Sequence, residues 1–404
     1  SNFSEATAAL TDARYQFLDF GDRLGATQCS QGLGEILSMQ NKYSEASTIL
    51  TNAQADFLSI GDRRGAAHCF QALGDNLRRQ GNGVEAAVLL ADARAQLLHI
   101  DDRFGAAQCA QSLGRILLYQ SNEYAEATST LMQARDLFLE IDDRLGATRC
   151  SQTFGEALRM QSKYSEAATI LTDTRSEFLD IGNRLGATQC SQRLGVILIT
   201  QTNYSEAAAI LTNARADFIE IGDHRGAAQC SQTLGEALRM QSKYSEAAAI
   251  LTDARNQFLG IGYRLGVASC SQSLGEILRM QKKYSEAAAI LTNARADFLE
   301  IGQRLGAVQC SMCLGDILSV QGNDSEATAV LTDARAQLLI IGDRLGAAQC
   351  SQILGKTMIK QSNYSEAAKF LMHARDQFLD IGFEDRAAHC SELLRDCTHD
   401  SDDE

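Results

Sequence analysis

The sequence of 404 residues contains no proline and no tryptophan, and aromatic residues make up only 6% of it. Proline interrupts helices, so its absence beside abundant Ala, Leu and Gln favours helix throughout. No apolar run approaches the roughly 18 residues that a membrane-spanning helix needs. The first residues also lack the basic-then-apolar pattern of a signal peptide. We therefore expect an all-α protein without a membrane partner.

Positive charge is scarce as well, because the formal net charge is −14 at pH 7. Nucleic-acid binding needs clusters of Lys and Arg against the phosphates, and the sequence has none, so we expect no nucleic-acid partner. The six histidines are scattered, without a Ser, Cys or carboxylate at motif spacing, and no phosphate-binding loop occurs. We expect no enzyme activity, no catalytic or metal site and no cofactor.

The twelve cysteines do not form the pattern of a disulfide framework, because ten of them recur once per 40 residues with a single step of 41. These ten are Cys29, Cys69, Cys109, Cys150, Cys190, Cys230, Cys270, Cys310, Cys350 and Cys390. A disulfide needs Cα atoms within about 7 Å, which equivalent positions of neighbouring repeats rarely provide. We interpret them as small apolar residues between helices, in a reducing compartment, the cytoplasm.

The whole chain repeats a unit of about 40 residues, and one copy reads "GDHRGAAQCSQTLGEALRMQSKYSEAAAILTDARNQFLGI". A fixed period of this size predicts a stack of small structural units. The one extra residue falls at 121–123, between two patterned segments, which indicates a turn.

Two segments of helical periodicity alternate within each unit. In the copy above, the first segment has its small and apolar residues at Ala227, Cys230, Leu234, Ala237 and Leu238. The second has them at Tyr244, Ala247, Leu251, Ala254, Phe258 and Ile261. Asp22, Asp62 and Asp102 stand where an N-cap of the first helix is expected. Each unit is therefore predicted to be a helical hairpin whose apolar face is covered only by its neighbours.

The stretch "LGEALRMQSKYSEAAAILTDA" resembles a tetratricopeptide (TPR) repeat. The matching residues in this copy are Leu234, Gly235, Tyr244, Glu246, Ala247 and Ala254. The glycine lets the two helices approach closely. The period of 40 residues resembles the long repeats of Pins-type adaptors and kinesin light chains, and the near-identity of the units resembles TPR arrays in fungal NTPase-linked sensors. The sequence departs from the family at Ser231, where an aromatic residue is usual, and in lacking the closing proline.

The resemblance implies a right-handed α-solenoid of about ten 40-residue TPR-like hairpins. We expect one solenoid over 1–397, with an unpaired helix at 3–20, hairpins from 22 to 381 and a capping helix at 384–397. Residues 398–404 are expected to form a disordered acidic tail.

Arrays of this family line a concave groove with the first helix of each hairpin. The helical periodicity places two glutamine columns and a column of acid–arginine pairs on that exposed face. The candidate groove residues are Gln111, Gln152, Glu156, Arg159, Gln189, Gln192, Gln229, Gln232, Glu236, Arg239, Gln272, Glu276 and Arg279. A glutamine can serve the backbone of an extended peptide. The alternative explanation is that glutamine is a good uncharged helix former and that the repeats duplicated recently.

Two functions remain open at this stage. The first is a non-enzymatic scaffold, part of an adaptor or sensor, that holds an extended or helical peptide of basic or mixed charge in the groove. The second is a structural protein whose nearly identical units stack end to end into homo-oligomeric filaments.

Overall fold

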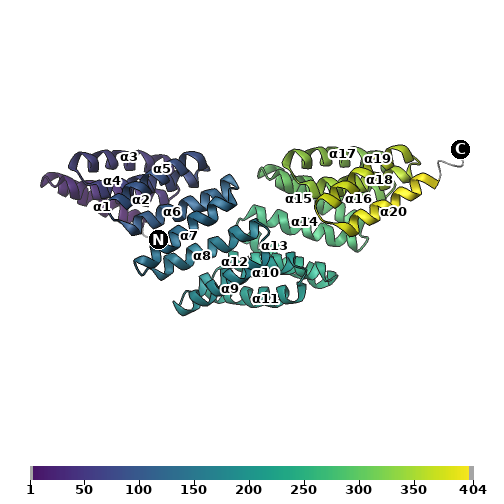
Figure 1. Cartoon of the computed structure of the whole chain (residues 1–404), viewed down its shortest axis with the longest axis horizontal. Coiled ribbons are helices and arrows are strands. Elements are labelled where there is room, and N and C mark those ends of the chain that lie inside the picture. Colours follow the sequence, from purple (N-terminus) through teal and green to yellow (C-terminus); the bar gives the residue numbers. More distant parts are fainter. Residues whose placement is uncertain (1–2, 400–404) are drawn as a thin grey trace. The chain divides into compact units, whose positions relative to one another are not determined.

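The computed structural model describes residues 3–399, without the side chains of residues 396, 398 and 399. In this range it contains 20 α-helices and one π-helical turn, and no strand (Figure 1). The chain divides into two compact units, Ser1–Thr202 and Asn203–Glu404. The expected all-α class is confirmed.

The first unit contains α1 (Phe3–Asp19), α2 (Arg23–Met39), α3 (Tyr43–Ile60), α4 (Arg63–Arg79), α5 (Gly83–His99), α6 (Arg103–Ile116), η1 (Leu117–Ser121), α7 (Tyr124–Glu140), α8 (Arg144–Met160), α9 (Tyr164–Asp180) and α10 (Arg184–Thr200). The second contains α11 (Tyr204–Ile221), α12 (His224–Met240), α13 (Tyr244–Gly260), α14 (Arg264–Met280), α15 (Tyr284–Glu300), α16 (Arg304–Val320), α17 (Asp324–Ile341), α18 (Arg344–Lys360), α19 (Tyr364–Asp380) and α20 (Glu384–His399). We call the even-numbered helices A helices and the odd-numbered ones B helices. The final helix extends two residues past its expected end at residue 397, and residues 400–404 of the expected tail lie outside the described residues.

Two turns occur in each repeat, one from the A helix to the B helix and one from the B helix to the next A helix, and each contains a residue in the left-handed backbone conformation. Between a B helix and the next A helix this residue is usually glycine, as at Gly222 with φ 83°, where a side chain would be strained. Asp223 follows it, and its side chain accepts a hydrogen bond from the backbone N–H of Gly226 at 2.9 Å. The N-caps expected at Asp22 and Asp62 make the same bond, so this prediction is confirmed.

The single extra residue of the chain is absorbed by a π-helical turn at the end of α6. In most of the other hairpins the N–H of the residue after the left-handed turn residue donates to a carbonyl five residues back, as from Lys163 to Leu158. Here Glu123 donates to the carbonyl of Leu117, six residues back, at 2.9 Å. The insertion therefore widens one helical turn and leaves the following B helix in register.

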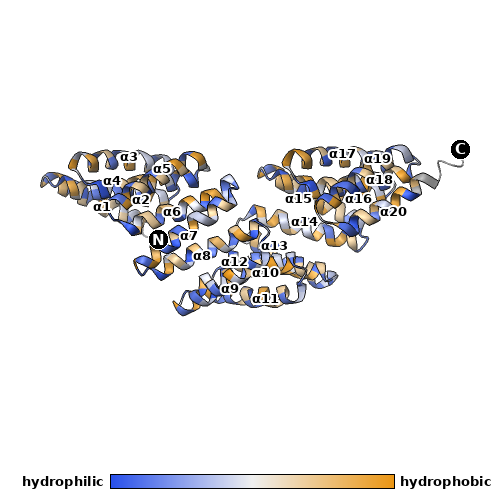
Figure 2. Cartoon of the chain, in the orientation of Figure 1, coloured by the Kyte–Doolittle hydropathy of each residue, from blue (hydrophilic) through white to orange (hydrophobic). Residues whose placement is uncertain are grey.

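The A helices from α2 to α18 each contain at least two glycines and pack between two B helices. A Cβ on Gly226 would lie 2.6 Å from the Phe218 ring of the preceding B helix, and one on Gly235 would lie 2.5 Å from Cγ of Leu251 in the following B helix. The cores that result span three successive helices, and one contains Ala268 of α14, Phe298 of α15 and Cys310 of α16. Figure 2 shows the apolar residues interleaved with polar ones along the helices. The predicted hairpin stacking is thus confirmed within each unit.

The interpretation of the cysteines as packing residues is also confirmed, because all twelve are buried and none of them forms a disulfide. Burial raises the pKa of the Cys109 and Cys310 thiols to about 12. One residue of the expected apolar stripe differs: Ile261, which follows the end of α13 at Gly260, is 44% exposed.

Candidate functional site

Glutamines form what we call the amide row, which runs along the A helices of each unit. It consists of the two glutamine columns that contain Gln229 and Gln232. The row joins hairpins at several places: Nε2 of Gln71 donates to Oε1 of Gln108 at 2.8 Å, and Nε2 of Gln272 donates to Oε1 of Gln309 at 3.3 Å. An amide on one A helix thus reaches an amide on the next A helix.

The amide row is less exposed than the sequence predicts. Gln152 is buried, and its Nε2 lies 3.4 Å from Oε1 of Gln189 and 3.5 Å from the carbonyl of Gly186. Gln111 is half-buried, with its Nε2 3.5 Å from Sγ of Cys150. The remaining glutamines of the candidate set are half-buried too: Gln189, Gln192, Gln229, Gln232 and Gln272. Neighbouring A helices pack closely enough for one glutamine to lie over the next, which the periodicity of a single helix could not reveal.

Beside the amide row lies a second line of side chains, the charged row, in which acids and arginines alternate. In the first unit Glu156 is buried, and Arg159 donates hydrogen bonds to both of its carboxylate oxygens at 2.6 and 3.1 Å. Arg193 of the next A helix approaches the same carboxylate at 3.8 Å. The i, i+3 pair expected at Glu156 and Arg159 is confirmed.

In the second unit the charged row links three hairpins. Arg239 pairs with Glu236 on its own helix and with Glu276 on the next one, the latter at 3.4 Å. Arg279 bonds Asp316 of the following A helix at 2.6 Å. The pairing expected between Glu276 and Arg279 is therefore wrong, because the carboxylate one hairpin on lies closer to the guanidinium than the one three residues back.

These contacts perturb the pKa values of the row. Burial raises the pKa of the Glu276 carboxyl above its ordinary value, although Arg239 acts in the opposite direction. Burial alone would lower the pKa of Arg239, but its hydrogen bond to Glu236 and the charges of Glu236 and Glu276 raise it. The arginine stays charged, and the row presents mixed charge with its members already paired.

Arginines of the B helices provide a further tie between hairpins. Arg215 of α11 pairs with Asp253 of α13 at 3.0 Å, and Arg255 donates to Oγ of Ser271 at 2.9 Å. These residues hold neighbouring hairpins together and need no ligand.

One cluster was missed by the sequence reasoning. The N-cap Asp102 is buried and accepts from the backbone N–H of Gly105 at 3.0 Å, from Arg64 Nε at 2.7 Å and, at 3.0 Å, faces Nε2 of His68. Burial would raise the pKa of this carboxyl, but these three partners together lower it. The sequence did contain a signal for this cluster: His68 stands in a column that is mostly glutamine, and an imidazole can pair with a carboxylate such as that of Asp102.

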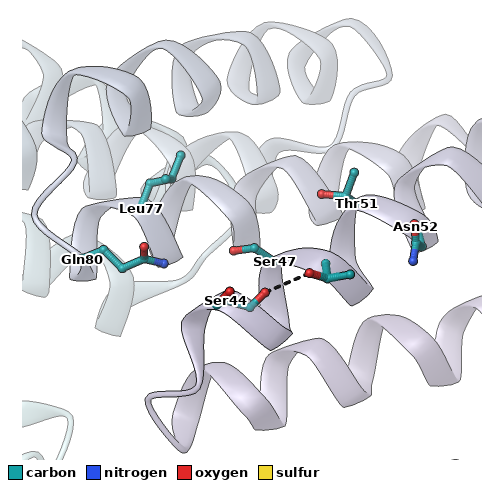
Figure 3. A pocket seen from close by; sticks show the side chains of 7 residues that line it. Ser44, Ser47, Thr51, Asn52, Leu77 and Gln80 are labelled. Carbon is teal, nitrogen blue, oxygen red and sulfur yellow. Dashed lines mark hydrogen bonds between the residues drawn. The ribbon is translucent and has the colours of Figure 1, made fainter.

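A shallow hollow of about 520 Å³ opens between α3 and the end of α4 (Figure 3). Its lining consists of Ser44, Ser47, Thr48, Thr51, Asn52, Leu77 and Gln80. The lining offers hydroxyl and amide groups but no ionisable side chain. It includes none of the candidate groove residues, and its residue types cannot perform acid–base chemistry at neutral pH.

The described residues also contain no group of three or more His, Cys, Asp and Glu that could hold a metal ion. None of the helices in residues 3–399 combines the length and apolarity needed to span a bilayer. The arrangement offers hydrogen bonds, paired charges and packing surfaces, which suit binding.

The tetratricopeptide repeat family matches this sequence over residues 187–259. Resemblance to that family is thereby confirmed. None of the curated proteins matches the sequence.

Solved structures of tetratricopeptide-like arrays share the fold at low sequence identity. The apo form of RapI aligns with a TM-score of 0.66 and 12% identity over 88% of this chain and 98% of its own. Aspartyl phosphate phosphatase F from Bacillus subtilis aligns with a TM-score of 0.60 and 11% identity, over 87% and 94%. A Rap protein complexed with competence and sporulation factor aligns at 0.54 and 13%, over 83% and 98%. At these identities the similarity extends to the helical-repeat fold alone.

Proposed function

We propose that this TPR-like chain is a non-enzymatic scaffold, part of an adaptor or sensor, that binds an extended or helical peptide along its A helices. The observation that carries the proposal is the half-exposed amide row, which repeats the same polar group on successive A helices. A ladder of this kind matches the periodic N–H and C=O groups of a peptide backbone.

At Gln272 and Gln232 part of the side-chain amide is left for a guest. In the described residues the contacts of Gln272 use its Nε2, which donates to Gln309 and to Glu276. Its Oε1 remains as an acceptor for a peptide N–H. Gln232 is followed one hairpin later by Ser269 instead of glutamine, so its half-exposed amide has no glutamine partner on α14.

The charged row determines which peptides fit. Acids and arginines alternate along it and neutralise one another, while the whole chain carries a net charge of −14. A basic or mixed-charge peptide gains from this surplus, whereas an acidic peptide is repelled. Buried thiols that form no disulfide fit a reducing compartment such as the cytoplasm.

The fold comparison agrees with this function at the level of architecture. One array with this fold was solved in a complex with competence and sporulation factor. Another is a phosphatase, but the carboxylates of the candidate groove, Glu156, Glu236 and Glu276, are each paired with an arginine of the charged row.

The test uses a peptide selected from a random display library against the intact chain. Replacing Gln152, Gln192, Gln232 and Gln272 together by alanine should abolish binding in fluorescence anisotropy while circular dichroism shows unchanged helicity. The control replaces four exposed B-helix threonines of the same region by alanine, Thr172, Thr212, Thr252 and Thr292. Equal affinity of both variants for the peptide would reject the amide row as the binding surface.

The alternative function, filament formation through the ends, has one observation in its favour. Helix α1 contains no buried residue, and Tyr15 and Phe20, at its end, are 63% and 83% exposed. A face of this kind can accept the last hairpin of another molecule. Light scattering that stays at the monomer value over a concentration series would exclude filaments.

A further inference from the structure

In the first unit the amide row is joined to the buried carboxylate of Asp102 through His68. Nε2 of His68 lies 3.0 Å from Oδ2 of Asp102, and its Nδ1 lies 3.3 Å from Oε1 of Gln71. Nε2 of Gln71 in turn donates to Oε1 of Gln108 at 2.8 Å. An unbroken chain of contacts thus leads from the carboxylate through the imidazole to two amides of the row.

Both ring nitrogens of His68 face hydrogen-bond acceptors. An ionised carboxylate only accepts, and so does an amide oxygen. Burial would raise the pKa of the Asp102 carboxyl, but the backbone N–H of Gly105, His68 and Arg64 together lower it, so the carboxylate is ionised. The arrangement therefore needs an N–H on each ring nitrogen, which only the charged imidazolium has.

Loss of one proton from His68 reverses the chain. Asp102 keeps the proton on Nε2, so the neutral ring presents the lone pair of Nδ1 to Gln71. The amide of Gln71 must then turn over so that its Nε2 donates to the ring and its Oε1 faces Gln108. The amide of Gln108 turns over in the same way. The proton leaves to solvent, which reaches the ring because the side chain of His68 is 25% exposed.

The reversal changes what Gln108 offers to a guest. With His68 charged, Oε1 of Gln108 accepts from Gln71, and Nε2 is left to donate to a peptide carbonyl. With His68 neutral, Nε2 is used within the row, and Oε1 is left to accept from a peptide N–H. Gln108 is half-buried, so part of its amide lies open to a guest.

The groups in contact with His68 come from its own helix and from α5 and α6. On α4, Arg64 shares the carboxylate of Asp102 with the imidazole. That carboxylate belongs to the N-cap of α6, and a Cβ on Gly105 of the same helix would lie 3.0 Å from Cε1 of the ring. Leu97 of α5 lies against the same glycine and is apolar.

The other helices packed on α4 add charge only at a further remove. Glu35 of α2 and the N-cap Asp62 act electrostatically on Cys69, the neighbour of His68 in the chain. Glu35 accepts from an amide of its own helix and Asp62 caps α4, so both carboxylates already have partners. The ring of Phe57 from α3 lies one turn before the histidine and is apolar.

We propose that His68 sets the direction of the hydrogen bonds in the amide row of the first unit, so that its protonation switches Gln108 between a donor and an acceptor for a bound peptide. The switch at the guest rests on the proposed peptide binding, whereas the reversal within the row is a property of the chain alone.

Solution NMR of the full chain with ¹⁵N-labelled glutamine tests the reversal without a ligand. The side-chain signal of Gln108, assigned by its loss in Gln108→Ala, should shift between about pH 5.5 and about pH 8, the range in which histidine changes charge. It should stay constant in His68→Gln, which restores the commonest residue of the column. It should also stay constant in Gln71→Ala, because that variant breaks the chain while leaving the histidine in place.

His389→Gln is the matched control, because His389 occupies the same column on α20 and faces Glu392 of its own helix. The signal of Gln108 should shift with pH in this variant as in the wild type. A signal that stays constant in the wild type, or that still shifts in His68→Gln or in Gln71→Ala, overturns the proposal.

Fluorescence anisotropy tests the switch at the guest. The probe is a histidine-free peptide selected from a random display library at about pH 8, whose binding is lost in Gln108→Ala. Its affinity for the wild type should fall about fivefold at about pH 5.5, the equivalent of one hydrogen bond, and should fall less than twofold for His68→Gln. An equal fall in both overturns the switch. If selection yields no peptide that depends on the amide row, the proposed function fails, and the NMR titration still decides the reversal.

Discussion

The close approach of the two helices of a hairpin makes a quantitative prediction for Gly235→Ala. The new Cβ would lie 2.5 Å from Cγ and 2.8 Å from Cδ2 of Leu251, a side chain with no exposed surface. Overpacking a core costs about 1–3 kcal/mol, and contact with a branch carbon that cannot move into solvent belongs at the upper end. Alanine regains about 1 kcal/mol of helix propensity. The net loss is therefore about 2 kcal/mol.

Gly260→Ala is the matched control, because nothing lies within 4 Å of the Cβ that it adds at the end of α13. It should stabilise the chain by about 0.5 kcal/mol through helix propensity alone. In a stack of hairpins that contact only their neighbours, the loss at Gly235 is local. Native-state hydrogen exchange of α12 and α13 should thus speed up about 30-fold in Gly235→Ala and not in the control.

A double substitution separates the steric clash from other causes. With Leu251→Ala in place, the clashing atoms are gone, so adding Gly235→Ala should become neutral or favourable. Unchanged or slower exchange in the single variant Gly235→Ala, or the same loss in the Leu251→Ala background, would refute the argument that this glycine is required by packing.

Three further outcomes are expected. The twelve thiols should resist a disulfide reagent in the native chain at pH 8 and react on unfolding, since burial raises the pKa of thiols such as Cys109 to about 12. Asp102→Asn keeps the cap but loses the charge, so it should cost about 1 kcal/mol at pH 7 against the control Asp223→Asn. The pKa of Asp102 is lowered in the folded state, so the difference in free energy of unfolding between the two variants should disappear as the pH falls through that pKa. Urea unfolding at a series of pH values measures this difference. Glu276→Gln should change the free energy of unfolding by less than about 1 kcal/mol at pH 7. The reason is that burial raises the pKa of Glu276 in the folded state, so the ionised carboxylate already destabilises the fold above about pH 4.3, the ordinary pKa of glutamate.

The sequence predicts the hairpins, their caps and their cores because each of these is encoded within one repeat. The periodicity of one helix identifies Cys230 and Leu251 as buried, and the position of Asp22 before a helical segment identifies a cap. The repetition then transfers each conclusion to the other hairpins, except where the residue itself changes, as at the cap positions Tyr263 and Gln303. The π-helical turn at the end of α6 escaped prediction, because an extra residue can be added to a loop or to a helical turn with the same sequence signal.

The candidate site was predicted less completely, because its contacts run between hairpins. A helical wheel places Gln152 and Glu156 on an outer face, yet both are buried under the next A helix. Likewise, Arg279 bonds Asp316, 37 residues away, instead of a residue on its own helix. The distance between equivalent positions of neighbouring hairpins is a property of the stack, and one repeat does not contain it.

Leucines exposed near the ends of the B helices illustrate the opposite case, in which the signal was present in the sequence. In "FLEI" the buried Phe298 is followed directly by Leu299, and adjacent residues on a helix face different directions. A leucine that repeats at this position in nearly every hairpin therefore had to point outward.

Site-specific photo-crosslinking with a selected peptide tests the central claim most directly. A photoreactive benzoylphenylalanine replaces Gln232 on the A helix or Thr252 on the B helix of the same hairpin, one at a time. Gln232 tolerates the probe because the next A helix has Ser269 instead of a glutamine partner. We predict that the peptide crosslinks at position 232 and not at position 252; crosslinking at 252 alone, or equally at both, would contradict binding along the A helices.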